Sequence, residues 1–168
     1  ESPVHIVLVQ ALASGDKMDW VVQKAVELGA SAIQPVQAER SVLRLAGERA
    51  DKRQAHWQQV AVAACEQCGR NRIPAVRPLQ PLTHWLAEHR DALSYVLAPG
   101  GAASFGLEPA PQGEVQLLVG PEGGWSDGEM AAFDAAGCRR VRLGPRVLRT
   151  ETAGLAAIAA LQARWGDF

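Results

Sequence analysis

Three stretches rich in glycine and proline each follow an apolar run, and together they could build a ligand site from main-chain groups. They are Leu97–Gly101 (LAPGG), Val119–Gly124 (VGPEGG) and Leu143–Arg146 (LGPR). In open parallel sheets, ligands bind beyond the carboxyl ends of the strands, where glycines let the backbone approach closely. A single stretch of this kind is typical of an ordinary turn, but three in succession indicate a shared site.

The middle stretch restricts the chemistry of the ligand. It precedes a predicted helix, as phosphate-binding loops do, yet it has neither the Lys-Ser/Thr of a P-loop nor a G-x-G-x-x-G spacing. It also carries Glu122, whose charge would repel a phosphate. A neutral or cationic ligand fits better, although Glu122 could equally accept hydrogen bonds from the N–H groups of its own loop.

Charged and hydroxyl side chains follow the third stretch. Thr150 or Thr152 could cap the next helix, and Glu151 could complement its dipole. Arg146 and Arg149 have fewer structural explanations, because they adjoin the glycine-rich site. Residues 139–149 hold five arginines and no acid, whereas residues 91–138 hold seven acids and no Lys or Arg. The basic cluster fits an anion or nucleic-acid contact, or equally a solvated strand edge.

Other chemistries find little support. Cys65 and Cys68 form half of a zinc-type motif, but no second pair exists, and we expect both on the apolar face of a helix. The four histidines show no ligand spacing, and no G-x-S-x-G motif is present. We therefore expect no metal site and no serine hydrolase.

These residues must be positioned by alternating strands and helices. Strands are predicted at Val4–Val9, Ala32–Gln37, Pro74–Leu79, Ser94–Ala98, Val115–Val119 and Arg139–Leu143. Helices are predicted at Asp16–Leu28, Glu48–Cys68, from about Pro81, at Ser126–Ala136 with a Ser126/Glu129 capping box, and at Thr152–Trp165. This alternation predicts an α/β fold, a mainly parallel sheet with helices on both faces.

Composition sets outer limits. The chain has 168 residues, 48% hydrophobic and 21% charged, which suits one domain, 1–168. No stretch is long and apolar enough for a membrane helix, and no signal segment opens the chain, so we expect a cytoplasmic protein without a membrane partner. The last helix, apolar all round, is expected to be buried on more than one side. It therefore predicts a homodimer.

Four ordered blocks of residues resemble the RsmE family, the uridine N3-methyltransferases of bacterial 16S rRNA, which belong to the SPOUT class. Two of them are Val119–Gly124 and Leu143–Ala153. A third block contains Lys17, Lys24 and Glu27–Gly29, and the fourth contains Glu66, Gln67, Arg70 and Pro74. Members usually begin with a small β-barrel RNA-binding domain, which we expect to be absent from this chain.

The resemblance implies a C-terminal deep trefoil knot, a dimer packed through the knot region, and S-adenosylmethionine as cofactor. The cofactor would be held mainly by backbone groups of the three loops. The implied residues are Leu97, Ala98, Pro99, Val119, Gly120, Pro121, Glu122, Gly123, Leu143, Gly144, Val147, Leu148 and Thr152. A cationic sulfonium also removes the difficulty posed by Glu122.

The implied reaction is methyl transfer to N3 of a uridine in 16S rRNA, within the assembled small ribosomal subunit. Arg149 would stabilise the uracil anion and Arg146 would serve phosphate or knot structure, while the base would be Glu151, Glu122 or water. The expected RNA contacts are Lys17, Lys24, Arg70, Arg72, Arg139, Arg140 and Arg142. Alternatives are a related SPOUT ribose 2′-O-methyltransferase and a non-catalytic knotted RNA-binding module.

Overall fold

The structure is a computed structural model that describes residues 1–102, 105 and 110–168. Its strands are β1 (His5–Ala11), β2 (Ala32–Gln37), β3 (Ala75–Val76), β4 (Gln80–Pro81), β5 (Leu93–Ala102), β6 (Glu114–Val119) and β7 (Arg139–Val141). Its helices are α1 (Lys17–Glu27), α2 (Glu48–Cys68), α3 (Leu82–Glu88), α4 (Asp127–Ala135) and α5 (Thr150–Trp165). The predicted alternation of strands and helices is confirmed, and β4 is a short strand that the sequence pattern did not reveal.

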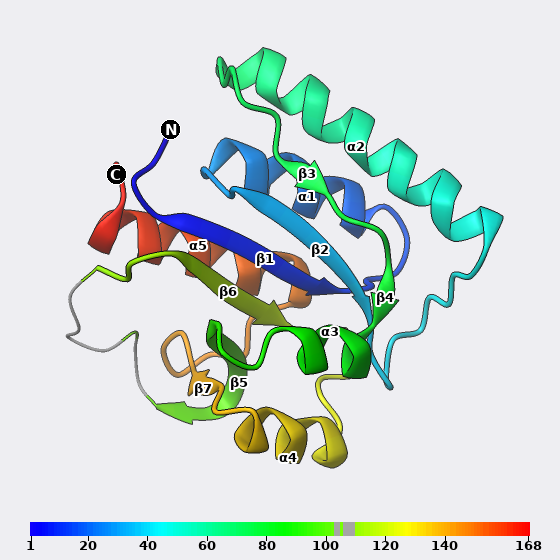
Figure 1. The fold of residues 1–168 in the computed structure, drawn as a ribbon, viewed down its shortest axis with the longest axis vertical. Helices are drawn as coiled ribbons and strands as arrows, with labels where there is room; N and C mark the ends of the chain where they lie inside the picture. The colour runs from blue at the N-terminus through cyan, green and yellow to red at the C-terminus, as the bar shows by residue number, and fades with distance from the viewer. Residues whose placement is uncertain (103–104, 106–109) are drawn as a thin grey trace.

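The strands form one sheet in the order β3-β2-β1-β6-β5-β7, with β4 also pairing β2 (Figure 1). Every pairing among the described strands is parallel. The carboxyl ends of β1, β2, β5 and β6 therefore meet along one edge of the sheet, which is where ligands bind in such folds.

Both faces of the sheet are buried under helices, as predicted. Ile6 and Leu8 of β1 pack into a core with α1, α2 and α5. Val7 and Val9, which point to the opposite face, pack into a second core with α3 and α4. This division explains why the central strands are continuous apolar runs rather than alternating ones.

Helix α5 packs unusually closely on the sheet at Gly154. A Cβ atom there would lie 3.1 Å from Val119 Cγ2 and 3.2 Å from Leu8 Cδ1, so the absence of a side chain lets the helix approach β1 and β6. The opposite side of α5 is only partly covered within this chain, because Leu155 and Ala156 are half-buried and Ala160 is exposed. Burial of α5 on more than one side therefore stays a prediction that requires a second subunit.

Two local predictions are corrected. Cys65 is buried against the core, but Cys68 is exposed, because it is the last residue of α2, at the end of the helix. Neither threonine caps α5: the N-cap position is Arg149, and Thr150 is already the first helical residue. The Ser126/Glu129 capping box of α4 is confirmed.

Two kinds of feature are missing from the part of the chain that the structure describes. No helix there is long and apolar enough to cross a bilayer. No cluster of three or more His, Cys, Asp or Glu side chains in the same residues could hold a metal ion.

Candidate functional site

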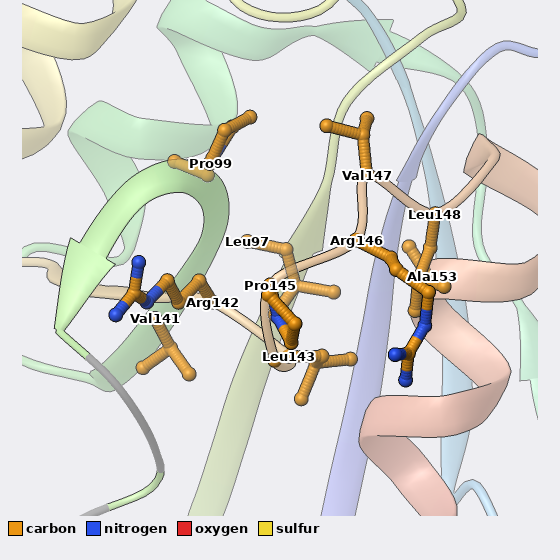
Figure 2. Close-up of a pocket in the computed structure, with 12 residues that line it drawn as sticks. Leu97, Pro99, Val141, Arg142, Leu143, Pro145, Arg146, Val147, Leu148 and Ala153 are labelled. Carbon is orange, nitrogen blue, oxygen red and sulfur yellow. The ribbon is translucent and has the colours of Figure 1, made fainter.

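The three glycine-rich stretches converge on two adjoining cavities at the carboxyl edge of the sheet. The smaller, of about 120 Å³, lies between Leu97–Pro99 at β5 and the segment 141–148 after β7. Figure 2 shows that segment 143–148 arches over the pocket, with Pro99 and Val147 at its rim. Its lining contains many aliphatic side chains, whereas the sequence predicted a site built mainly from main-chain groups.

The larger cavity, of about 400 Å³, has more charged side chains in its lining. Val119–Glu122 form one wall and Val147–Glu151 form another, and Lys17 contributes from the start of α1. The two cavities share five lining residues: Leu97, Pro99, Val147, Leu148 and Ala153. They are therefore neighbouring parts of one site.

Thr150 links the elements around this site through hydrogen bonds. Its hydroxyl donates a hydrogen bond of 2.5 Å to the carbonyl of Gly120 and accepts one of 3.0 Å from the Gln10 amide. Gln10 is fully buried in β1 and also donates to the carbonyl of Ala11. The first residue of α5 is thus bonded to the middle glycine loop and to the central strand.

Trp125 is a site residue that the sequence reasoning missed. It lines the larger cavity, and its indole N–H donates to the carbonyl of Leu97, 3.2 Å away. Its ring also lies so close to Gly120 that a Cβ atom there would come within 3.2 Å of it. The available signal was a large aromatic residue directly after a glycine loop, where a turn alone does not require one.

Glu122 is held as a carboxylate by the segment that precedes α1. Its Oε1 accepts hydrogen bonds from the Ser14 hydroxyl (2.6 Å), the Ser14 amide (2.9 Å) and Lys17 Nζ (2.9 Å). Partial burial acts to raise the pKa of Glu122, but these hydrogen bonds outweigh it and lower the pKa to about 2. The side chain is therefore anionic at neutral pH and a weak base.

Glu151 offers a different kind of carboxylate. It lines the same cavity, and its Oε2 is buried without a hydrogen-bond partner among the described residues. The nearest charged group is Lys17 Nζ, 3.9 Å away, which already bonds Glu122. A buried oxygen of this kind is available to accept a hydrogen bond from a ligand.

The predicted arginines flank these carboxylates. Arg149 lines the larger cavity from the N-cap position of α5. Arg142 and Arg146 line the smaller one, and Figure 2 shows the Arg146 side chain running toward the helix that carries Ala153. All three side chains are exposed, and none forms an ion pair among the described residues.

Most of the predicted cofactor residues lie together. Eleven of the thirteen line one or both cavities: Leu97, Ala98, Pro99, Val119, Gly120, Pro121, Glu122, Leu143, Gly144, Val147 and Leu148. Gly123 and Thr152 line neither. Gly123 instead packs on Arg40, where a Cβ atom would lie 3.0 Å from Arg40 Cβ, and Thr152 is exposed on α5.

The structure gives internal partners to several predicted RNA contacts. Arg70 donates to the carbonyls of Val26 and Ala30 after α1 and pairs with Glu1, which is a structural role.

Three other side chains in this set also meet carboxylates. Lys24 pairs with Glu27, Arg140 pairs with Asp134, and Lys17 belongs to the cavity. Arg72 and Arg142 are exposed, and Arg139 lies over the Tyr95 ring. Four of the seven predicted RNA contacts are therefore paired with carboxylates.

The chain is similar to known proteins over almost its entire length. Residues 1–162 match the family model described as RNA methyltransferase domain. The curated protein "Ribosomal RNA small subunit methyltransferase E" of Buchnera aphidicola is 33% identical over 169 residues, covering 100% of this chain and 67% of that protein. The chain thus spans about two thirds of the length of this curated relative.

Two solved structures share the whole fold. A ribosomal RNA small subunit methyltransferase E from Neisseria gonorrhoeae, bound to S-adenosylmethionine, is 46% identical with a TM-score of 0.93. A putative methyltransferase from Legionella pneumophila, also in complex with that cofactor, is 40% identical with a TM-score of 0.93. Each match covers 100% of this chain and 69% of the other.

Proposed function

This chain belongs to the family of RNA methyltransferase domains, and from that membership we propose that it transfers a methyl group from S-adenosylmethionine to N3 of a uridine in 16S rRNA of the small ribosomal subunit. The observation that carries the proposal is the convergence of three glycine-rich loops on one site, with Arg149 and Glu151 facing the same cavity. The relatives with bound S-adenosylmethionine support the choice of cofactor.

The site fits such a cofactor. Aliphatic walls at Leu97, Leu143 and Leu148 suit an adenine ring, and the ionised Glu122 suits a ligand that carries positive charge. Gly144 has a φ of 74°, which glycine adopts without strain, and a Cβ atom there would meet nothing. When bound, S-adenosylmethionine supplies an electrophilic methyl group on a sulfonium.

The chain must make N3 of uracil nucleophilic. N3 carries a proton, and the electron pair released when it leaves forms the new N–C bond while the C–S bond breaks toward sulfur. Glu151 accepts that proton, because its buried Oε2 has no hydrogen-bond partner among the described residues and lies 3.9 Å from Lys17 Nζ. Glu122 is unsuited to this role, because a carboxylate with a pKa of about 2 is a weak base.

Arg149 stabilises the negative charge that spreads onto O2 and O4 of the uracil. It stands two residues from Glu151 at the start of α5, so one short segment supplies both the base and the cation. Arg146, beside the smaller cavity, serves phosphate binding or holds the loop. The target nucleotide must leave its stack to enter the cavity.

The assembled protein is proposed to be a homodimer that acts in the cytoplasm, where ribosomal subunits lie. The partly covered side of α5 offers an apolar surface to a second copy, as does Val147, which lines the site and is 82% exposed.

The proposal is tested by incubating the chain with radiolabelled S-adenosylmethionine and small ribosomal subunits that lack the modification. The rRNA is then digested, and its nucleosides are identified by mass spectrometry. We expect label in N3-methyluridine. Label in a 2′-O-methylated nucleoside would favour the ribose methyltransferase, and RNA binding without any label would favour the non-catalytic module.

A further inference from the structure

The loop between β2 and α2, residues 38–47, adjoins the site but was not assigned a role from the sequence. It leaves the carboxyl end of β2, at the same edge as the glycine loop that follows β6 (Figure 1). Arg40 joins the two loops, because its Nη1 donates to the carbonyls of Gly123 (3.3 Å) and Trp125 (3.1 Å). The position of this loop is therefore fixed relative to the cavity.

Arg44 and Arg49 present uncompensated charge beside this junction. Each donates from one nitrogen to a neutral carbonyl, Arg44 to Glu39 and Arg49 to Arg44. Neither forms an ion pair within residues 1–102, 105 and 110–168, and both are exposed. This distinguishes them from Lys24, Arg70 and Arg140, whose charges carboxylates neutralise.

The two arginines border an open hollow of about 420 Å³, together with Gln37, Leu45 and Ala46. Residues 38–53 contain five basic and three acidic residues, and one of the acids, Glu48, pairs with Lys52. Val42, at the tip of the loop, is 74% exposed. The guanidinium groups of the two arginines are planar, bidentate hydrogen-bond donors at a solvated surface, which suits the binding of phosphate groups.

We propose that Arg44 and Arg49 bind the phosphates of the RNA strand that carries the target nucleotide, beside the glycine loop that Arg40 joins to theirs. This inference rests on the proposed function for the identity of the anion. RNA fits better than a small anion because the hollow is open and lies outside the cavity. The strand would lie across the loop while one nucleotide enters the site.

The test compares a double variant, Arg44→Gln with Arg49→Gln, with a control, Arg90→Gln with Arg164→Gln. Glutamine keeps a donor for the carbonyl contacts while removing the charge. The control arginines are also exposed, but they follow α3 and end α5, at the other edge of the sheet. Binding of fluorescein-labelled single-stranded RNA is followed by anisotropy at several salt concentrations, and methyl transfer to small subunits is measured in parallel.

We expect the double variant to bind RNA roughly ten- to thirtyfold more weakly at about 0.1 M salt, with a salt slope lower by about 1 to 2. The KM for small subunits should rise while kcat and the affinity for S-adenosylmethionine stay unchanged. The control should bind as the wild type does.

The outcomes separate this inference from the proposed function. Wild-type binding and salt slope in the double variant, with methyl transfer intact, would overturn the inference alone. Weakened binding as expected, in a chain that transfers no methyl group, would support the RNA surface and overturn the proposed reaction. A wild-type chain that binds no RNA and transfers no methyl group to small subunits would overturn both.

Discussion

At the scale of single residues, the site divides its charged groups between fixed and available ones. Glu122 accepts three hydrogen bonds from Ser14 and Lys17, so its charge and position are set before any ligand arrives. Within the described residues, Glu151 keeps a buried oxygen without a hydrogen-bond partner, and Arg149 forms no ion pair. We therefore assign Glu122 to structure and cofactor binding, and Glu151 and Arg149 to the methyl-transfer reaction.

Replacing Arg149 with alanine should lower the rate of methyl transfer by about 10²–10³, because the uracil anion loses its cation. The affinity for S-adenosylmethionine should change little. Single-turnover transfer and calorimetric titration measure the two quantities, and Arg90→Ala is the matched control. Unchanged transfer by Arg149→Ala would remove Arg149 from the mechanism.

Glu122 should make the stability of the folded chain depend on pH under acidic conditions. Its folded pKa of about 2 lies below the ordinary value of 4.5, so its ionised form stabilises the fold above about pH 4.5. That contribution declines as the pH falls from 4.5 toward 2. We expect the melting temperature of the wild type to exceed that of Glu122→Gln at pH 7, and the gap to close over this range.

Thermal unfolding followed by circular dichroism measures this gap, with Glu66→Gln as a control at an exposed carboxylate. A gap that stays constant from pH 7 to pH 2 would show that Glu122 does not hold its charge through Ser14 and Lys17.

At the scale of elements, α5 connects the parts of the site. Its first turn carries Glu151, its N-cap is Arg149, and Thr150 bonds the helix to Gly120. Further along, Gly154 lets the same helix lie close to β1 and β6. The placement of the reactive groups therefore depends on the packing of this helix.

Thr150→Val should loosen that connection without a change in side-chain volume. The carbonyl of Gly120 loses its donor, so we expect the free energy of unfolding to fall by about 1–2 kcal/mol and the affinity for S-adenosylmethionine to fall with it. Urea unfolding and calorimetry measure the two, and Thr83→Val, at an exposed position of α3, is the control. If Thr150→Val and the wild type had equal stability and equal affinity, the hydrogen bond from Thr150 to Gly120 would not support the fold or the site.

Much of this element structure could be predicted from the sequence. The apolar runs, and the glycine that ends the helix, predicted β2 and α2 with their observed bounds. The Ser126/Glu129 pair predicted the start of α4. The two-residue β4 could not be found, because so short a segment has no periodicity. The role of Trp125 and the inward turn of Arg70 could not be found either, because both depend on contacts between residues distant in the chain.

At the scale of the whole molecule, the parallel sheet brings loops from β2, β5 and β6 to one edge, and the segment after β7 joins them there. The glycine stretches were recognisable as a common site because strand ends meet in such a sheet. The adjacent arginine loop was not, because only the strand order shows that β2 and β6 lie two places apart. The trefoil knot that the resemblance implies stays a prediction.

The half-buried outer side of α5 predicts that two chains associate. Light scattering after size exclusion should give a mass about twice 17.9 kDa. Ala160→Glu, on that side of the helix, should shift the mass toward one chain, because a charge placed in an apolar interface is costly. A wild-type mass of one chain at micromolar concentration would contradict the predicted dimer.

The central claim is that the three glycine-rich loops form a single cofactor site. Calorimetric titration of the purified chain with S-adenosylmethionine tests it most directly. We predict saturable binding at one site per chain, retained in Arg149→Ala and weakened in Thr150→Val. A correctly folded chain that gives no binding signal would contradict the claim.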